Sequence, residues 1–289
     1  MQPSKTAPKR PVLRYHGGKM LLAKWILSYF PPHRIYVEPY GGAASVLMQK
    51  PRSYAEVYND VWDEVVNLFR VLRDPESAPR LECQLKLTPF ARVEFEEAYC
   101  LEVEPVERAR KLLIRSFMGH GSASANAAHK TGFRNDSMRS GTTPYNDWKH
   151  WPDYITEMTE RLQGVCIEHR PAAQIIEEFD GTETLFYVDP PYSLITRPSA
   201  KTRKNSCYAH EMTDTQHREL SEVLRKCAGM VILSGYPCAL YDELYGDWGR
   251  AERIARADGA QKRTEVLWMN AAAIRGMAQG SLFDGDATI

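Results

Sequence analysis

The sequence predicts an α/β fold, with parallel strands covered by helices on both faces, and three observations support this. Short β-like runs at 35–38 and 55–58 are each followed by a segment of helical periodicity. A glycine-containing turn joins the first of these strands to its helix. The same alternation returns at 165–168 and continues to residue 269. Strands that alternate with helices pair in parallel, because each helix carries the chain back to the starting edge of the sheet.

The composition is that of a chain that builds a large core. The chain has 289 residues, of which 43% are hydrophobic and 26% are charged, close to the averages of globular domains. No apolar run approaches the roughly 18 residues that cross a bilayer, and no apolar signal segment follows the basic N-terminus. The six cysteines lack zinc-ligand spacing. We therefore expect a cytoplasmic protein without a membrane span or a metal site.

Local signals predict the N-terminal elements. Residues 1–11 are polar, basic and rich in proline, which predicts a flexible leader. Residues 20–30 have helical periodicity and end at two consecutive prolines. Asn59 and Asp60 follow the second strand and are suited to cap a helix that extends to Leu72. The apolar face of the helix predicted over 20–30 consists of Leu22, Trp25, Ile26 and Tyr29.

An interruption separates the two halves of the predicted sheet. Residues 88–118 have a helical period throughout, and residues 119–147 form a long segment rich in Gly, Ser, Asn and Thr. Regular strands return only after it. We interpret the chain as a core domain of two segments, an inserted and mainly helical module, and a flexible tail. These parts are 12–74 and 161–275, 75–160, and 276–289.

The net charge is zero, but the charges are unevenly distributed. Residues 51–107 contain 13 acidic and 6 basic side chains, whereas residues 108–150 contain 8 basic and 2 acidic ones. Residues 193–210 add four lysines and arginines and no acidic side chain. Two basic segments therefore suit a polyanion such as nucleic acid, although ordinary solvated surfaces give the same pattern.

A glycine turn and a later aspartate together indicate a nucleotide-binding site. Glu38, Tyr40, Gly41 and Gly42 lie where the first strand leads into its helix, the position at which dinucleotide-binding folds hold their ligand. Asp60 ends the next strand, where a carboxylate accepts hydrogen bonds from ribose hydroxyls. The pair predicts an adenosine-containing ligand. Each signal alone has a simpler explanation, since glycine turns are common and Asp60 can cap its helix.

The most specific motif is Asp189-Pro190-Pro191-Tyr192, directly after the apolar run 185–188. Two prolines fix the backbone and remove two N–H donors, which leaves carbonyl oxygens free to accept. The Asp189 carboxylate and the Pro190 carbonyl can each accept one N–H of an amino group on a flat ring, while Tyr192 stacks on that ring. The alternative is a surface Asp-Pro turn with a structural tyrosine.

Taken in order, the motifs resemble those of Dam-like N6-adenine DNA methyltransferases. The resemblance covers residues 13–270, most of the chain. It implies a Rossmann-like methyltransferase sheet, S-adenosylmethionine as cofactor, and a target-recognition role for the insert at 75–160. The motifs that carry it are Tyr15-His16-Gly17-Gly18-Lys19, Glu38-Pro39-Tyr40 with its glycine turn, Asn59-Asp60, Asp189-Pro190-Pro191-Tyr192 and Arg263-Thr264-Glu265-Val266-Leu267.

Carried over by position, the resemblance implies a cofactor pocket. Ala44 departs from the family pattern, which more often has glycine there, and a positive φ at Ala44 would strain an alanine. His16 replaces a residue that is often small. The cofactor contacts that the resemblance implies are Tyr15, Lys19, Glu38, Tyr40, Gly41, Gly42, Asp60 and Asp189.

The resemblance also implies the reaction. If Asp189 and the Pro190 carbonyl accept its two protons, adenine N6 directs its lone pair at the donor methyl group, with no covalent enzyme intermediate. The base must leave the duplex to reach this site, so double-stranded DNA is the expected partner. Asn126 and Asn135 are candidates for reading adenine. The basic side chains expected to contact DNA are Arg115, Lys130, Arg134, Arg139, Arg197, Lys201, Arg203 and Lys204.

Two alternative functions fit the same motifs. An Asp-Pro-Pro-Tyr site accepts any planar amino group, so N4 of cytosine or an amino group in RNA or protein is an alternative substrate. The second alternative is a catalytically silent DNA-binding relative. The intact Lys19, Asp60, Asp189 and Tyr192 argue against that second alternative.

The C-terminal segment 279–283 contains a further short motif. Its sequence resembles the peptides that dock on the bacterial sliding clamp, with Gln279, Leu282 and Phe283 as the expected contacts. A flexible tail would leave such a peptide accessible. A frayed apolar tail is the simpler explanation.

Overall fold

The computed structural model describes residues 7–126, 130–135, 141–193, 196, 208–256 and 262–284. A seven-stranded sheet lies at its centre, with the strand order β3-β2-β1-β4-β5-β7-β6. The first five strands of that order are parallel, and β7 is antiparallel to both of its neighbours. The predicted α/β fold class is therefore confirmed. The strands are β1 (Ile35–Glu38), β2 (Ala55–Asn59), β3 (Val165–Glu168), β4 (Thr184–Val188), β5 (Met230–Gly235), β6 (Gly249–Arg256) and β7 (Lys262–Met269).

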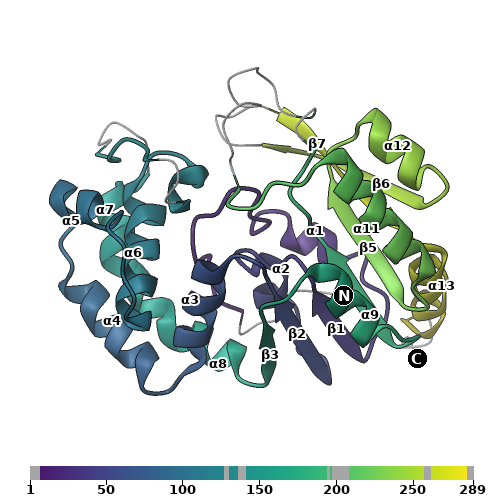
Figure 1. Cartoon of the computed structure of the whole chain (residues 1–289). Helices are drawn as coiled ribbons and strands as arrows, with labels where there is room; N and C mark the ends of the chain where they lie inside the picture. Colours follow the sequence, from purple (N-terminus) through teal and green to yellow (C-terminus); the bar gives the residue numbers. More distant parts are fainter. Residues whose placement is uncertain are drawn as a thin grey trace.

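Helices cover both faces of this sheet (Figure 1). Successive side chains of a strand point to opposite faces, so Tyr36 of β1 belongs to one buried cluster and Val37 to the other. Strands β4 and β5 are buried along their whole length, as expected where both faces are covered. The first cluster includes α1 (Ala23–Leu27), α2 (Ser45–Gln49), α3 (Asp63–Arg73) and α8 (Ile155–Leu162), and the second includes α9 (Ala172–Phe179), α11 (Asp214–Lys226) and α12 (Ala239–Tyr245).

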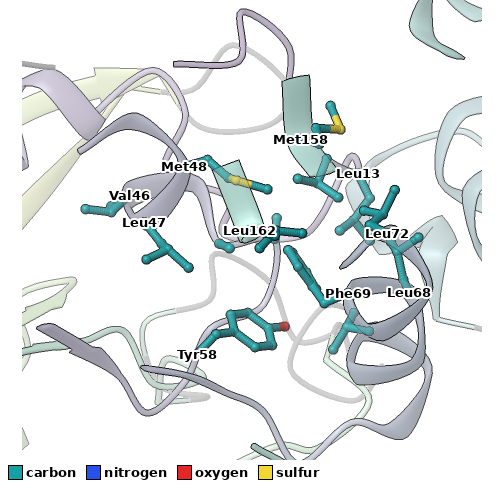
Figure 2. Packing of buried hydrophobic residues seen from close by; sticks show 14 of the residues in the cluster. Leu13, Val46, Leu47, Met48, Tyr58, Leu68, Phe69, Leu72, Met158 and Leu162 are labelled. Atoms are coloured by element: carbon teal, nitrogen blue, oxygen red, sulfur yellow. The ribbon is translucent and has the colours of Figure 1, made fainter. Parts of the chain in front are cut away.

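Figure 2 shows part of the first cluster. The ring of Tyr58 from β2 lies against that of Phe69 from α3, with ring centroids 4.4 Å apart. Leu47 of α2 and Leu162 of α8 approach the same rings. All four side chains are completely buried. The helix that follows the glycine turn is thus fixed to the sheet by close packing rather than by its own length of five residues.

The helical insert lies beside the sheet (Figure 1). Its core is continuous with that of the sheet, since Leu81 and Leu113 belong to the same buried cluster as Phe69. The boundary predicted at residue 160 falls inside α8. The insert contains α4 (Ser77–Leu87), α5 (Arg92–Glu97), α6 (Pro105–Met118) and α7 (Pro144–His150), with short 3-10 helices η1 (Ser122–Ala125) and η2 (Trp151–Tyr154).

The N-terminal predictions need two corrections. The helix expected over 20–30 is only α1, because its N-terminal part forms a turn in which Leu22 N–H donates to the Lys19 carbonyl at 2.9 Å. Within the expected flexible leader, the Pro8 carbonyl accepts from Gln49 Nε2 at 2.7 Å. The Pro11 carbonyl accepts from Trp151 Nε1 at 3.0 Å. These bonds hold residues 8–11 against the core.

The C-terminal tail is also different from the prediction. Residues 271–284 form α13 (Ala271–Asp284), which packs so closely that a Cβ on Gly276 would lie 2.9 Å from Pro31. The expected clamp-binding segment 279–283 is therefore helical, and nothing in the described residues supports a sliding-clamp site. No helix in the described part of the chain has the length and apolarity needed to span a membrane.

Candidate functional site

A cavity of about 700 Å³ opens where the parallel strands end. Ligands of open α/β sheets bind at this edge, because the turns that follow neighbouring strands meet there. Four turns that are distant in sequence line the cavity together with residues 216–223 of α11 and the start of α9. They are 15–19, 40–43, 60–62 and 208–212, with Asp189 between them.

The turn after β1 requires its glycines. A Cβ on Gly41 would lie 2.1 Å from Tyr58 Cε2, and one on Gly42 would lie 2.9 Å from Tyr15 Cε1. Gly42 also has a φ of +47°. No side chain larger than hydrogen fits at either position, so the backbone itself forms this wall of the cavity.

Ala44 has the positive φ that, according to the sequence analysis, would strain an alanine. Its φ is 50° and its ψ is 33°, which costs an L-residue roughly 1–2 kcal/mol. Its N–H donates to the Gly41 carbonyl at 2.7 Å, and it stands directly before α2. The alanine at this position is therefore strained.

Asp60 braces the glycine turn from the end of the neighbouring strand. Its Oδ2 accepts from Gly42 N–H at 2.8 Å and its Oδ1 from Trp62 N–H at 2.8 Å. Each carboxylate oxygen has a second lone pair, so Asp60 retains acceptor capacity toward the cavity. Burial raises the pKa of Asp60, and the two backbone N–H bonds and His210 oppose that rise.

Glu38 has a positioning role beneath the turn. It is 2% exposed, and its Oε1 accepts from Tyr36 OH at 2.6 Å and from Leu47 N–H at 2.7 Å. Burial raises its pKa to about 8, although the bonds from Tyr36 and Leu47 oppose this. The bond to Leu47 fixes the first turn of α2 against β1.

The cavity is strongly acidic. Its described lining contains five acidic side chains and one lysine, Lys19, and one of the five, Glu38, with a pKa of about 8, is mostly protonated at pH 7. Burial raises the pKa of Tyr15, and Asp60 and Asp189 raise it further. A ligand that carries positive charge is favoured in such a cavity. The acidic side chains are Glu38, Asp60, Asp189, Glu211 and Glu219.

Four side chains form what we call the active-site cluster: Lys19, Asp189, Tyr192 and Glu265. Lys19 Nζ lies 2.8 Å from Asp189 Oδ2 and 3.7 Å from Glu265 Oε1. The hydroxyl of Tyr192 donates to Glu265 Oε1 and lies 3.1 Å from Asp189 Oδ1. Ser234 Oγ donates to the same Asp189 oxygen at 2.8 Å. The cluster joins the loop before α1 and the turn after β4 to the antiparallel strand β7.

Tyr192 does not have the position expected for a stacking side chain. It is 6% exposed, and neither it nor Pro190 is among the described residues that line the cavity. Its ring packs edge-on against Tyr236, with centroids 4.6 Å apart, and Lys19 Nζ lies 4.9 Å from its centre. In this structure the ring supports Lys19, and its hydroxyl orients the two carboxylates.

Two parts of this site were not assigned a role from the sequence. Glu265 belongs to the motif 263–267 but received no role there; the available signal was that it is the one acidic residue of β7, directly before the apolar run 266–269. Tyr208 borders the cavity, with its ring 5.0 Å from His16 and its hydroxyl where a Cβ on Gly17 would lie. No local pattern indicates Tyr208, because its position depends on contact with the 15–19 turn.

The expected DNA contacts require one correction. Arg115 is 3% exposed; its Nη2 donates to Glu64, and its Nη1 donates to the Ala98 carbonyl at 2.6 Å. It is a structural residue of the insert and is not available to a phosphate. Lys130 and Asn135 are exposed, Arg134 is half-buried, and Asn126 is buried. Arg139, Arg197, Lys201, Arg203 and Lys204 lie outside the described residues.

Comparison with known protein families gives a match over most of the chain. The sequence model of the D12 class N6 adenine-specific DNA methyltransferase family matches residues 15–258. The match begins at Tyr15 in the cavity wall and includes the turns after β1, β2 and β4.

Proposed function

The chain belongs to the D12 class N6 adenine-specific DNA methyltransferase family, and on this premise we propose that Asp189 holds the amino group of a flipped-out adenine beside S-adenosylmethionine. Membership makes the protein an enzyme that methylates adenine N6 in DNA with a methyl donor of the S-adenosylmethionine type. The residues that bind the two substrates, and their roles, are our proposal. It rests on one observation: Asp189 lies at the cavity formed by Lys19, the glycine turn and Asp60.

The cavity suits S-adenosylmethionine in shape and charge. Gly41 and Gly42 present bare backbone to a ligand, and Asp60 retains lone pairs for ribose hydroxyls. The acidic lining favours a molecule whose sulfonium and ammonium groups outnumber its carboxylate. Tyr15 and Tyr40 provide aromatic surface in the same cavity.

S-adenosylmethionine supplies a methyl group on a sulfonium: the bond from N6 to the methyl carbon forms as the C–S bond breaks, and a proton leaves the nitrogen. Asp189 accepts one N–H of the amine, and we assign the other to the Pro190 carbonyl. Accepting both protons turns the N6 lone pair out of conjugation and toward the methyl group. The carboxylate also stabilises positive charge on the nitrogen, because it acts in a site shielded from water.

DNA reaches the site only if the base leaves its stack. Asp189 has 18% side-chain exposure, so an adenine within a duplex cannot contact it. We infer that the target nucleotide rotates into the opening beside Asp189. Exposed Lys130 and half-buried Arg134 of the insert remain candidates for phosphate contacts, as do the basic residues of the segment 197–204.

Methyl transfer to unmethylated phage DNA tests the assignment. We expect Asp189→Ala to lower transfer of tritiated methyl groups by at least about a hundredfold, and nucleoside analysis of the wild-type product to give N6-methyladenine. Asp242→Ala is the matched control, since Asp242 is exposed and, among the described residues, forms an ion pair with Arg250, away from the cavity. Activity of Asp189→Ala within tenfold of wild type would disprove the role of Asp189. N4-methylcytosine as the product would restore the alternative substrate.

A further inference from the structure

The active-site cluster contains a carboxylate that the reaction as described does not use. Glu265 comes from β7, is 3% exposed, and does not line the cavity. It nevertheless contacts two other members of the cluster, Tyr192 through a hydrogen bond and Lys19 at 3.7 Å. Burying a carboxylate costs free energy unless charged or hydrogen-bonding partners compensate for it.

Asp189 is already occupied in this structure. Its Oδ1 accepts from Ser234 at 2.8 Å, and the Tyr192 hydroxyl lies 3.1 Å from the same oxygen but donates its one hydrogen to Glu265. Its Oδ2 holds the Lys19 ammonium at 2.8 Å. A charged donor binds a carboxylate more strongly than a neutral amine does. An adenine amine that binds Asp189 therefore shares this carboxylate with the Lys19 ammonium, whose charge disfavours the positive charge that develops on N6.

We propose that Glu265 is a positioning residue that takes Lys19 from Asp189 when the adenine amine arrives. The proposal rests on the function proposed above. Lys19 then exchanges one carboxylate for another and is never left unpaired. The distance between Lys19 and Glu265 exceeds an ion-pair hydrogen bond by only about 1 Å. A rotation of one flexible side chain closes it.

The charges of the cluster support this exchange. Lys19 is the one cation facing two carboxylates in the described cluster. Burial alone would lower the pKa of Lys19, but Asp189 and Glu265 outweigh it and raise the pKa, so the ammonium is retained. Burial and the nearby Asp189 raise the pKa of Glu265 despite Lys19. Glu265 is thus incompletely compensated while Lys19 stays on Asp189, and a closer Lys19 relieves this.

Tyr192 lies between the two positions of the Lys19 ammonium, on Asp189 and on Glu265. Its hydroxyl donates to Glu265 and lies near Asp189, and its ring lies beneath Lys19 Nζ. Tyr236 fixes the ring from the other side. The ammonium therefore moves over a surface that stays in place, from one oxygen to the other.

The test is Glu265→Gln, which keeps the shape and the acceptor for Tyr192 but removes the charge. We expect the methyl-transfer rate at saturating S-adenosylmethionine and unmethylated phage DNA to fall by about a hundredfold, because release of Lys19 then leaves a buried ammonium unpaired. The affinity for the cofactor analogue sinefungin and the melting temperature should be unchanged. Glu265→Asp, which keeps the charge, should recover part of the rate.

Glu252→Gln is the matched control. Glu252 lies on the adjacent strand β6, is exposed, and pairs with Arg250, so its variant should equal the wild type. A Glu265→Gln rate within threefold of wild type overturns the proposal. A loss of sinefungin affinity or of melting temperature that accounts for the whole rate loss also overturns it, since this indicates a structural role. Asp189→Ala separates the two claims: if that variant is inactive while Glu265→Gln is active, only the exchange of Lys19 is wrong.

Discussion

Two buried charge clusters lie at opposite ends of the parallel strands, and they differ in the sign of their surplus charge. The tie cluster, which we define as Lys50, Glu56 and Arg161, has two cations and one carboxylate where β2 begins. The active-site cluster has one cation and two carboxylates where β4 ends. Lys19, Tyr192 and Glu265 are as buried as the tie cluster, and only Asp189, at 18% side-chain exposure, opens to the cavity, so burial of most of its members does not distinguish a structural cluster from a functional one.

The tie cluster has no alternative arrangement. Glu56 Oε1 accepts from Lys50 Nζ at 2.6 Å, and Glu56 Oε2 accepts from Arg161 Nη1 at 2.7 Å. Arg161 Nη2 also donates to the Leu47 carbonyl at 2.6 Å. These bonds connect α8 and the end of α2 to the first residues of β2. Moving either cation would leave it without a carboxylate, and this fixes the geometry.

The two clusters differ in whether a buried cation has a second carboxylate within reach. Among the described residues, Lys50 and Arg161 both pair with one carboxylate, that of Glu56, whereas Lys19 has two carboxylates within 4 Å. A buried cation beside an incoming amine can withdraw only where a second carboxylate can take it. A surplus of carboxylates in the active-site cluster provides that second position.

The largest difference should appear in stability. Glu56→Gln leaves two buried cations without a carboxylate and should lower the free energy of unfolding by about 3–5 kcal/mol. Glu265→Gln removes surplus negative charge and should change it by less than about 1 kcal/mol. Urea denaturation at pH 7 measures both, with the exposed Glu252→Gln as control. Equal losses for the two buried variants would remove the distinction between the clusters.

The next largest effect should be a pH dependence caused by Glu38, which lies between the clusters. Asp189 contributes to raising its pKa and Lys50 to lowering it, but burial dominates and the pKa reaches about 8, above its ordinary 4.5. A raised folded-state pKa gives a contribution to stability that is complete below pH 4.5 and is lost as the pH rises toward 8.

The unfolding free energy of the wild type should therefore contain a decrease of about 2 kcal/mol between pH 5 and pH 7 that Glu38→Gln lacks. Urea midpoints at pH 5, 6 and 7 for the two proteins measure this difference. Parallel pH profiles would show that Glu38 titrates in the folded protein as it does in the unfolded chain.

The smallest effect concerns α2, which runs from the glycine turn of the cavity to the tie cluster. Its first residue follows the strained Ala44, and Lys50 of the tie cluster stands at its end. Ala44→Gly should raise the free energy of unfolding by about 0.5 kcal/mol, because relief of the left-handed strain exceeds the entropy cost of glycine. Ala43→Gly, one residue earlier and without a positive φ, should lower it by about 1 kcal/mol. Thermal denaturation distinguishes the two signs.

Local patterns were sufficient for much of the fold and for half of the site. Hydrophobic periodicity identified the alternating strands and helices, because side chains repeat every two residues in a strand and about every 3.6 in a helix. The glycine turn, Asp60 and Asp189 were identifiable because strand ends meet at one edge of a parallel sheet. The lengths of α1 and α13 were not predicted, since both depend on packing against other elements.

The sequence by itself determined the α/β class, the motifs and their order, because these depend on residues that are neighbours along the chain. The tertiary structure alone decided which charges meet. Arg115 resembled a surface cation until the fold placed it against Glu64, 51 residues away. Glu265 had no role until β7 brought it to Tyr192, 73 residues away. Charge pairing depends on distance and burial, and both are fixed only when the chain has folded.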